Sequence, residues 1–454
     1  MKLAKVIPVF KKGDEKETNN YRPISLLSCL SKILEKVIYS RTIDFLQHHN
    51  IFFDSQFGFR EKHNTTHAIL TLIDKIAQAS DQHCHTLGVF LDFSKAFDTI
   101  NHDILLYKLS YYGSRGKALE WFRSYLQNRK QFVTVQNKDS STQDINCGVP
   151  QGSLLGPLLF IIYINDFHKS SPRLSFLHFA DDSSIFFSHR NPNYLVDTLN
   201  NELKLASDWI KSNKLSLNLQ KTNYMLFSNS LNNIPADIMF DNTLINKESQ
   251  IKFLGVILDD KLSWKFHTLN ICKIISRNIG IINKLKWFLP QTVLLTLYST
   301  LVLPYLNYGI LAWGNSMATQ LQKILLLQKK VMRIICRSDF RAHTDSLFKS
   351  NNILKVSDIY TLNLGSFMFQ LNKRDLPKVF YNMFNTNNQY HSYPTRQSSF
   401  YHLPRTRTLF ANKIFTNSGP KFWNSLSSEI RECNTIYTFK RKLKTLLINA
   451  YENI

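Results

Sequence analysis

The apolar and polar positions predict a mixed chain, in which strands and helices alternate up to about residue 260 and helices dominate afterwards. Within residues 30–46 apolar side chains recur at helical spacing, so Ile33, Val37 and the group 43–46 are expected to share a buried face. Further helices are predicted over 102–113, 117–129, 193–212, a helical hairpin at 263–303, 318–337 and 438–451.

Short runs rich in β-branched and aromatic residues predict strands, with Gly and Pro marking the turns. The run "RLSFLHFADDSSIFFS" predicts two strands with Asp181 and Asp182 at the tip between them, and residues 147–167 predict a Gly/Pro loop that feeds an apolar helix. The other predicted strands are 86–93, 131–136, 251–260 and a pair within 214–228 that carries Lys221.

Composition predicts two or three domains and an anionic partner. The 454 residues exceed the usual size of one hydrophobic core, and 44% of them are hydrophobic. With 56 Lys and Arg against 33 Asp and Glu the net charge is +23, which favours nucleic acid over an anionic membrane. Residues 261–340 hold eleven Lys or Arg and a single acid, Asp339, which predicts helices with a basic outer face.

We expect no secretion signal, no transmembrane segment and no disulfide framework. Its opening, "MKLAKVIPVFKKGDEKE", becomes charged too early for a signal peptide. Residues 294–314 are long enough to span a bilayer, but Pro304 and Asn307 favour a buried helix pair. The six cysteines include no C-x-x-C pair, which argues against a zinc ribbon and fits a reducing compartment.

The adjacent Asp181 and Asp182 pose the main chemical question, because neighbouring carboxylates in an apolar run repel each other unless a cation compensates them. Mg²⁺ prefers carboxylate oxygens, and Asp92, at the end of another predicted strand, is the natural third ligand. Two ions about 4 Å apart stabilise both the attacking and the leaving oxygen of a phosphoryl transfer. Asp pairs also occur in ordinary turns, so these residues alone predict such a site only weakly.

Longer motifs, which occur in a fixed order along the chain, strengthen this prediction. They are "VIPVFKKGD", "NYRPISLLS", "SQFGFREKHNTTHAI", "LDFSKAFDTINH", "GVPQGSLLGPLLF", "FADD", "LNLQKTNYMLF" and "IKFLGVILDDKLSW". Over residues 5 to 265 the chain resembles the reverse transcriptases of LINE-type (non-LTR) retrotransposons, in particular the jockey-like group. "LYSTLVLPYLNYGILAWG" and the tail with "FWNSL" and "FKRKLK" resemble, less specifically, the region C-terminal to the polymerase in that group.

The resemblance implies the metal-binding and sugar-selecting residues. Asp92 and Asp181 match the shared metal ligands, Asp182 matches a supporting carboxylate, and the backbone carbonyl of Phe93 is expected to add an oxygen ligand. Phe97 matches the steric gate that selects deoxynucleotides. From the residues alone, a core aromatic is the preferred interpretation of Phe97.

The resemblance also implies residues that bind the nucleotide. Gln151 and Gly152 match the loop beneath the incoming nucleotide and the template base, where glycine permits close backbone approach; a Pro-Gly turn before a helix is the alternative. Lys221 matches the residue that protonates the departing pyrophosphate.

Three more basic residues are implied to grip the triphosphate. Arg22 matches a fingers residue, and its guanidinium suits phosphate oxygens. Lys12 and Arg60 are further candidates, for which a solvated surface charge is an equally good interpretation.

The implied function is that of an RNA-directed DNA polymerase. Two Mg²⁺ ions, or Mn²⁺ as a substitute, would assist attack of a primer 3′-hydroxyl on a dNTP. The implied partners are template RNA, a DNA primer or RNA–DNA hybrid, and dNTPs, with no membrane. The implied fold is an α+β right-hand polymerase with fingers at 1–80, an antiparallel-sheet palm at 81–260, a helical thumb at 261–340 and a basic nucleic-acid-binding module at 341–454.

Departures from the family pattern leave alternatives open. The fingers are expected to be truncated at their N-terminus, and an endonuclease would have to be supplied elsewhere. One alternative is therefore a truncated or reused relic that binds RNA or DNA without catalysis. A two-metal nuclease would need the same acids but not Phe97, the VPQGS loop or Lys221, and the jockey-like motifs disfavour a telomerase-like or group II intron-type enzyme.

Overall fold

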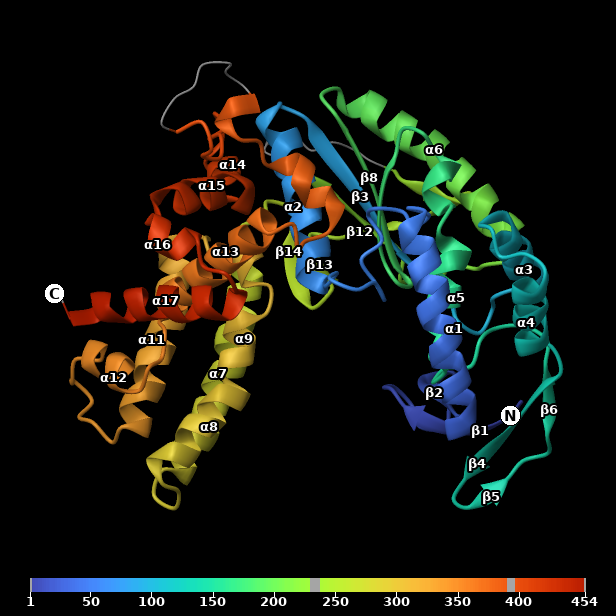
Figure 1. Cartoon of the computed structure of the whole chain (residues 1–454), viewed down its shortest axis with the longest axis horizontal. Helices are drawn as coiled ribbons and strands as arrows, with labels where there is room; N and C mark the ends of the chain where they lie inside the picture. The colour runs from blue at the N-terminus through green and yellow to red at the C-terminus, as the bar shows by residue number, and fades with distance from the viewer. Residues whose placement is uncertain (1, 229–236, 390–396, 453–454) are drawn as a thin grey trace.

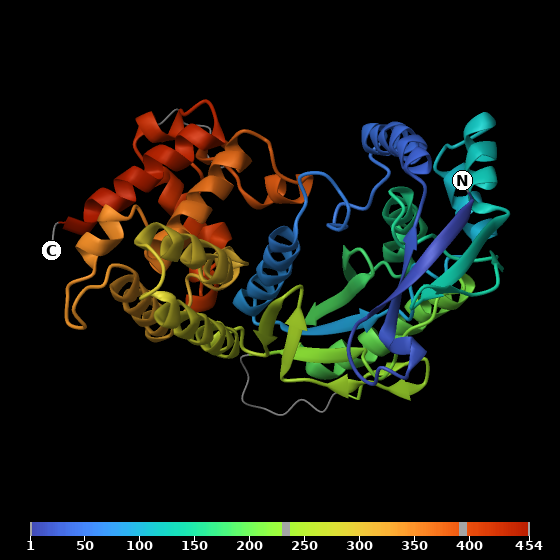
Figure 2. The ribbon, with the colours of Figure 1, turned by 90° about the horizontal axis from the view of Figure 1, so that it is seen from below.

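The computed structural model describes residues 2–228, 237–389 and 397–452, which form two halves lying side by side (Figure 1). The N-terminal half, up to about residue 260, holds two five-stranded sheets and their helices, and the C-terminal half is helical (Figure 2). This arrangement confirms the predicted α+β class. No helix in the described ranges combines the length and apolarity that a membrane crossing requires.

The central sheet joins strands that are far apart in the sequence, in the order β12–β9–β3–β8–β7. β3 runs antiparallel to its neighbours β8 and β9, and β7 runs antiparallel to β8 across a tight turn. The strands are β3 (His85–Asp92), β7 (Ser175–Phe179), β8 (Asp182–His189), β9 (Asn223–Phe227) and β12 (Asn246–Lys247). The structure thus confirms the predicted strand at 86–93 and the strand pair within 173–188.

The two faces of the central sheet belong to different hydrophobic cores, because successive side chains of a strand point to opposite faces. Leu87 and Val89 of β3 pack in one core with α5 and α6. Phe186 of β8 packs in the other core with α2. These helices are α2 (Thr65–Asp81), α5 (Leu155–Ile164) and α6 (Pro192–Ser212).

A second sheet, near the N-terminus, was only partly predicted. Its strands are β1 (Leu3–Phe10), β2 (Tyr21–Leu26), β4 (Arg129–Val135), β5 (Lys138–Asp139) and β6 (Gln143–Ile145). Of these, β4 covers the predicted strand at 131–136. β1 and β2 carry Pro8 and Pro23, which oppose each other in the antiparallel register, and proline weakens the sequence signal of a strand because it cannot donate to the ladder.

Helix α1 (Cys29–His48) is present where a helix was predicted, but part of the expected buried face is wrong. Ile43 and Leu46 are buried, whereas Ile33 and Val37 are 61% and 48% exposed. The side chain buried in their place is Glu35, which accepts hydrogen bonds from the Tyr125 hydroxyl (3.1 Å) and the Leu154 amide (2.7 Å). A buried polar contact therefore sets the orientation of the first half of this helix.

Two other strand predictions are corrected by the structure. Within 214–228 only β9 is a strand; the residues before it form a turn, which contains Lys221. The predicted strand at 251–260 is a hairpin of β13 (Gln250–Phe253) and β14 (Val256–Asp259). It turns at Leu254 and Gly255, both of which have positive φ (43° and 84°), and glycine adopts that conformation without strain.

The C-terminal half is a helical assembly around α13. Its longer helices are α7 (Lys265–Leu285), α8 (Gln291–Leu301), α11 (Ala318–Ile335), α13 (Val356–Asn372), α15 (Phe415–Ser425) and α17 (Ile436–Asn449). Its shorter ones are α9 (Leu303–Asn307), α10 (Ile310–Trp313), α12 (Asp345–Ser350), α14 (Leu409–Lys413) and α16 (Ser428–Arg431). These confirm the predicted hairpin at 263–303, the helix at 318–337 and the terminal basic helix. In the N-terminal half, α3 (His102–Tyr111) and α4 (Lys117–Leu126) also lie where predicted.

Helix α2 connects the two halves, because it packs on the central sheet and also contacts α10 and α14. Asp74 in its middle accepts a hydrogen bond from the Thr416 hydroxyl (2.9 Å). At its end, the backbone amide and guanidinium of Arg407 donate to Asp81. The C-terminal half is thereby attached directly to the helix behind the central sheet.

Candidate active site

The turn between β7 and β8 presents the two adjacent aspartates. Ala180 has φ of 57°, so the chain reverses tightly there and β8 begins at Asp182. The prediction of both aspartates at the hairpin tip is thereby confirmed for Asp181, which lies in the turn, whereas Asp182 is the first residue of β8 and pairs with Phe179. β3 then places Asp92 directly opposite Asp182 in the antiparallel register. The sheet therefore brings together carboxyls from two distant parts of the sequence.

The segment "SQFGF", residues 55–59, holds this turn in place. The amide of His178 donates to Ser55 O (2.9 Å), and the Gln56 side-chain oxygen accepts from the amides of both Gly58 (2.9 Å) and Ala180 (3.1 Å). A Cβ atom at Gly58 would collide with the backbone of Ala180. Sequence reasoning did not assign this supporting role to Gln56 and Gly58, although both lie in one of the family-like motifs.

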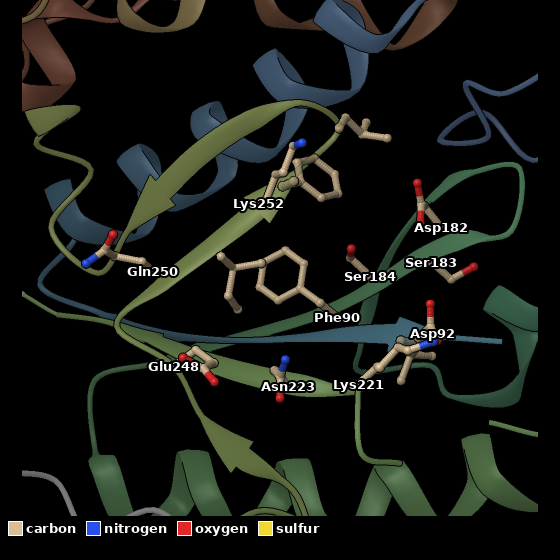
Figure 3. A pocket seen from close by; sticks show the side chains of 14 residues that line it. Phe90, Asp92, Asp182, Ser183, Ser184, Lys221, Asn223, Glu248, Gln250 and Lys252 are labelled. Carbon is tan, nitrogen blue, oxygen red and sulfur yellow. The ribbon is translucent and has the colours of Figure 1, made fainter. Parts of the chain in front are cut away.

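Asp92, Asp182 and Lys221 line one pocket of about 400 Å³, in which they come from β3, β8 and the turn before β9 (Figure 3). The Lys221 Nζ lies 3.7 Å from Asp92 Oδ2. The side chains of Lys221 and Asp92 are 59% and 43% exposed, so the pair is open to solvent and reachable by a substrate. The close-up shows the lysine directed toward the carboxyl of Asp92.

The electrostatics of the site make ionisation of these aspartates unfavourable. Burial, together with the charges of Asp181 and Asp92, raises the pKa of Asp182 to about 6. Burial and the charge of Asp92 also raise the pKa of Asp181, while Arg22 and Lys11 oppose this rise. A cation bound between the carboxyls would relieve the repulsion.

The turn that carries Lys221 is bonded to the end of β3. The amide of Asn218 donates to Asp92 O (2.8 Å), and the amide of Ser94 donates to Ser216 O (2.8 Å). These bonds flank Phe93, whose ring is buried and whose carbonyl takes part in neither of them. The backbone oxygen expected to serve as a metal ligand is thus not used by this pairing.

The donor set suits a hard divalent cation, because it consists of carboxylate and carbonyl oxygens. Within the described ranges, no three His, Cys, Asp or Glu side chains come close enough to form a ready-made metal cluster. Besides burial, the charges of Asp181 and Asp92 raise the pKa of Asp182, and the charge of Asp92 raises that of Asp181. The oxygen donors are therefore of the type that a hard divalent cation binds, although the described residues do not form a ready-made cluster.

The loop 149–153 and the turn after β3 are bonded to each other. The side-chain Nε2 of Gln151 donates to Asp98 Oδ1 (2.9 Å), and the backbone amide of Val149 donates to Phe97 O (2.9 Å). Burial raises the pKa of Asp98. Phe97 is half-buried against Phe160, with ring centroids 4.7 Å apart. Both the core interpretation and a position at the cleft edge are compatible with this packing.

Gly152 connects this loop with the N-terminal sheet. Ser25 of β2 donates its amide to Gln151 O (2.7 Å), and a Cβ at Gly152, where φ is 129°, would collide with Ser25 O. The predicted close backbone approach at Gly152 therefore occurs, but toward β2. It fixes the loop between the two sheets.

The three basic residues expected at the triphosphate differ in their surroundings. Arg22, on β2, and Lys11 exert their charge on Asp181, and Lys11 is a residue that sequence reasoning missed. Its neighbour Lys12 is exposed in the turn after β1. The guanidinium of Arg60 donates to Phe53 O (2.8 Å) and Gln56 O (3.2 Å), so it supports the segment that holds the aspartate turn.

Comparison with known proteins identifies relatives of this chain. The family model described as "Reverse transcriptase (RNA-dependent DNA polymerase)" matches residues 10–258. The "Probable RNA-directed DNA polymerase from transposon BS" of Drosophila melanogaster is 32% identical over 378 residues, which cover 79% of this chain and 41% of that protein. The "RNA-directed DNA polymerase from mobile element jockey" of the same species is 27% identical over 385 residues, covering 82% and 42%. The chain spans about two fifths of the length of these relatives.

Solved structures are similar at a lower level. The telomerase of Candida albicans in complex with a fragment of telomeric RNA is 13% identical, with a TM-score of 0.43, over 80% of this chain and 60% of that chain. The apo telomerase of Candida tropicalis is 12% identical, with a TM-score of 0.42, over 79% and 63%. Likeness at this level does not bear on the chemistry of the site. The sequence relatives, by contrast, confirm the predicted resemblance to the jockey-like group.

Proposed function

The chain belongs to the reverse transcriptase family, with relatives among the jockey-like non-LTR retrotransposons, and on this premise we propose that it is an RNA-directed DNA polymerase. It would extend a DNA primer on template RNA with dNTPs. One observation carries the proposal most directly: Asp92 and Asp182 oppose each other across β3 and β8, with Asp181 in the adjoining turn and Lys221 beside Asp92.

Asp92, Asp181 and the Phe93 carbonyl would hold two divalent ions, Mg²⁺ or Mn²⁺ in its place, with Asp182 in a supporting role. When bound, such ions lower the pKa of the primer 3′-hydroxyl and compensate the charge of the phosphates. The oxygen donors and the unfavourable ionisation of Asp182 support this assignment.

The remaining side chains would position the nucleotide and move one proton. Lys221 Nζ would donate a proton to the departing pyrophosphate, for which its open position near Asp92 is suitable. Arg22, with Lys11, would bind the triphosphate, and their charge at Asp181 supports this role. Phe97 would exclude a ribose 2′-hydroxyl.

Gln151 and Gly152 would form the floor of the nucleotide site. Their bonds to the Phe97 turn and to β2 support this role, because a loop fixed from two sides offers a defined surface to a base pair. Lys12 and Arg60 remain weaker proposals, since one is a surface charge and the other is engaged by loop carbonyls.

We also propose the division into fingers at 1–80, palm at 81–260, thumb at 261–340 and a basic module at 341–454. The central sheet, in which β9, β3, β8 and β7 pair antiparallel and β12 joins β9 in parallel, supports the palm, and helices α7, α8 and α11 support the thumb. Template RNA and an RNA–DNA hybrid are the proposed partners, and the net charge of +23 supports a polyanion.

The test is Mg²⁺-dependent incorporation of dTTP on poly(rA) primed with oligo(dT), by the full chain and by Asp181→Asn. Incorporation is expected, and its rate is expected to fall at least about 100-fold in the variant, because a metal ligand is lost. Asp197→Asn, at an exposed position of α6, is the matched control and should retain the rate.

Two results would overturn the proposal. If the full chain and Asp181→Asn incorporate dTTP at equal rates, the incorporation does not depend on Asp181. If neither protein incorporates dTTP but the chain binds the hybrid tightly and salt-sensitively, the alternative of a nucleic-acid-binding relic replaces the polymerase.

A further inference from the structure

Three of the most exposed large side chains of the described residues lie at one tip of the helical C-terminal half, where α7 meets α8 and where α11 ends. Trp287 and Phe288, in the turn between α7 and α8, are 74% and 82% exposed, and Phe340, after α11, is 84% exposed. We call them the distal aromatic cluster. Large aromatic side chains are usually at least half-buried, so three of them in water at one end are a feature to be explained.

The two segments that carry the cluster are joined by hydrogen bonds. The guanidinium of Arg337 donates to Lys286 O (2.9 Å) and Leu289 O (3.2 Å), on either side of Trp287 and Phe288. Phe340 comes three residues later, in a loop that folds back because Arg333 Nε donates to Ala342 O (2.9 Å). The aromatic residues are therefore presented by fixed turns.

The surroundings of the cluster are basic. Four basic residues lie within four positions of the rings in the sequence: Lys284, Lys286, Arg337 and Arg341. The Lys286 ammonium lies 4.7 Å from the Trp287 ring centroid. The single acid there, Asp339, accepts a hydrogen bond from the Arg341 amide (2.8 Å), so it stabilises the turn. Figure 1 shows this end of α7, α8 and α11 far from β3 and β8, so the cluster is separate from the carboxylate site.

We propose that the distal aromatic cluster binds single-stranded RNA, by stacking unpaired bases on Trp287, Phe288 and Phe340 while the flanking cations contact phosphates. Exposed rings interleaved with Lys and Arg are the combination that single-strand-binding proteins use, and a stacked base contributes roughly a factor of 5 to 100 in affinity. A paired strand keeps its base faces covered, so a duplex would gain only the phosphate contacts.

The choice of RNA as the strand rests on the proposed function, because template RNA outside the hybrid would be the single strand available. An anionic membrane surface would also attract aromatic and basic side chains. The cluster is carried by two short turns and not by an amphipathic helix face, and this favours the polynucleotide.

The experiment is a titration of the full chain with a uridine 12-mer, monitored by tryptophan fluorescence at high salt, where phosphate contacts weaken. The chain has six tryptophans, and Trp287 alone is exposed, while Trp121, Trp209, Trp264, Trp313 and Trp423 are half-buried or buried. Quenching is expected, and it should vanish in Trp287→Ala. Phe340→Ala, which keeps the tryptophan, should weaken binding about tenfold.

Tyr107→Ala is the matched control, since Tyr107 is a 72% exposed aromatic residue on α3. Equal affinities of Phe340→Ala and Tyr107→Ala, or no quenching by the 12-mer, would overturn the proposal. If phosphatidylserine vesicles shift the tryptophan emission to shorter wavelength and RNA has no effect, the cluster binds a membrane surface and the RNA proposal is wrong. Incorporation by Asp181→Asn tests the polymerase separately, because RNA binding at the cluster should persist in that variant.

Discussion

The central sheet and the N-terminal sheet contribute differently to the proposed centre. Leu87 and Val89 of β3 are fully buried, and helices cover both faces of the central sheet, so the strand carrying Asp92 is held from two sides. On the N-terminal sheet, Val9 of β1 is 49% exposed, and Ile33 of the following helix is 61% exposed. The aspartates are thus carried by a sheet that is buried on both faces, whereas Arg22 and Lys11 belong to a sheet region whose apolar side chains are partly exposed.

The two sheets meet at the loop that contains Gln151 and Gly152. Ser25 bonds this loop from β2, and Asp98 bonds it from the turn after β3. The positions of Arg22 and Lys11 relative to the aspartates therefore depend on a few contacts. Substitutions in the central sheet should therefore affect folding and chemistry together, whereas substitutions of the exposed Arg22 and Lys11 should affect nucleotide binding alone.

The largest effect on rate is expected from Lys221→Met. If this lysine donates the proton to pyrophosphate, kcat falls by roughly 100-fold while the KM for dTTP changes little. Steady-state kinetics on the primed poly(rA) template measures both constants. Lys204→Met, on the exposed side of α6, is the control. A rise in KM with unchanged kcat would instead assign Lys221 to ground-state phosphate binding.

The support of the aspartate turn by residues 55–59 is tested by Gly58→Ala. The added methyl group would meet the backbone of Ala180, which cannot move aside as a flexible side chain could, so the free energy of unfolding should fall by about 3 kcal/mol. Urea unfolding measures this change. Gly280→Ala in α7, where the new Cβ meets no atom within 4 Å, should leave stability equal or raise it by about 1 kcal/mol.

On the N-terminal side, the contrast within α1 is the next test. Glu35→Ala removes the acceptor for the Tyr125 hydroxyl and the Leu154 amide, so the free energy of unfolding should fall by about 2 kcal/mol. Ile33→Ala should change it by less than about 0.5 kcal/mol, because that side chain is exposed. A larger loss of stability in Ile33→Ala than in Glu35→Ala would mean that the Ile33 side chain is buried in solution.

The contact between the two halves has a pH dependence. Burial raises the pKa of Asp74 to about 6 from the 3.8 of an exposed group. The folded state therefore keeps a proton that the unfolded state loses, and its stability falls as pH rises from about 4 through 6. We expect this loss to be on the order of 3 kcal/mol, and Asp74→Asn should flatten it. Unfolding curves at several pH values measure how the free energy of unfolding changes with pH. If this pH dependence is the same in Asp74→Asn, it is caused by other groups.

The sequence predicted the strands that carry the aspartates because their alternation and their turn signals agree. The prediction was wrong or incomplete where a local pattern fits two different orientations of the chain. Ile33 and Val37 have the spacing of a core face, but the bonds of Glu35 turn the helix the other way. Lys11 and Lys12 are adjacent, and only the orientation of the chain after β1 decides which charge acts on Asp181.

Other features depend on distant contacts that a single sequence does not reveal. The bond between the Gln56 side chain and the Ala180 amide links positions 124 residues apart. The approach of Gly152 to Ser25 could be anticipated from the glycine, but its partner could not. The resemblance to a known family supplied the roles of the residues, and the structure supplied their supports.

The most direct test of the two-metal centre is a count of Mn²⁺ ions bound to the full chain, measured by electron paramagnetic resonance of the free ion. The chain would be mixed with dTTP and a poly(rA) hybrid whose primer ends in a dideoxynucleotide, so that no turnover occurs. We expect the ternary complex to hold one ion more than its components do, because dTTP already carries the other ion in solution, and this extra ion should be lost in Asp181→Asn. An identical count for the wild-type chain and for Asp181→Asn would contradict a metal centre at these aspartates.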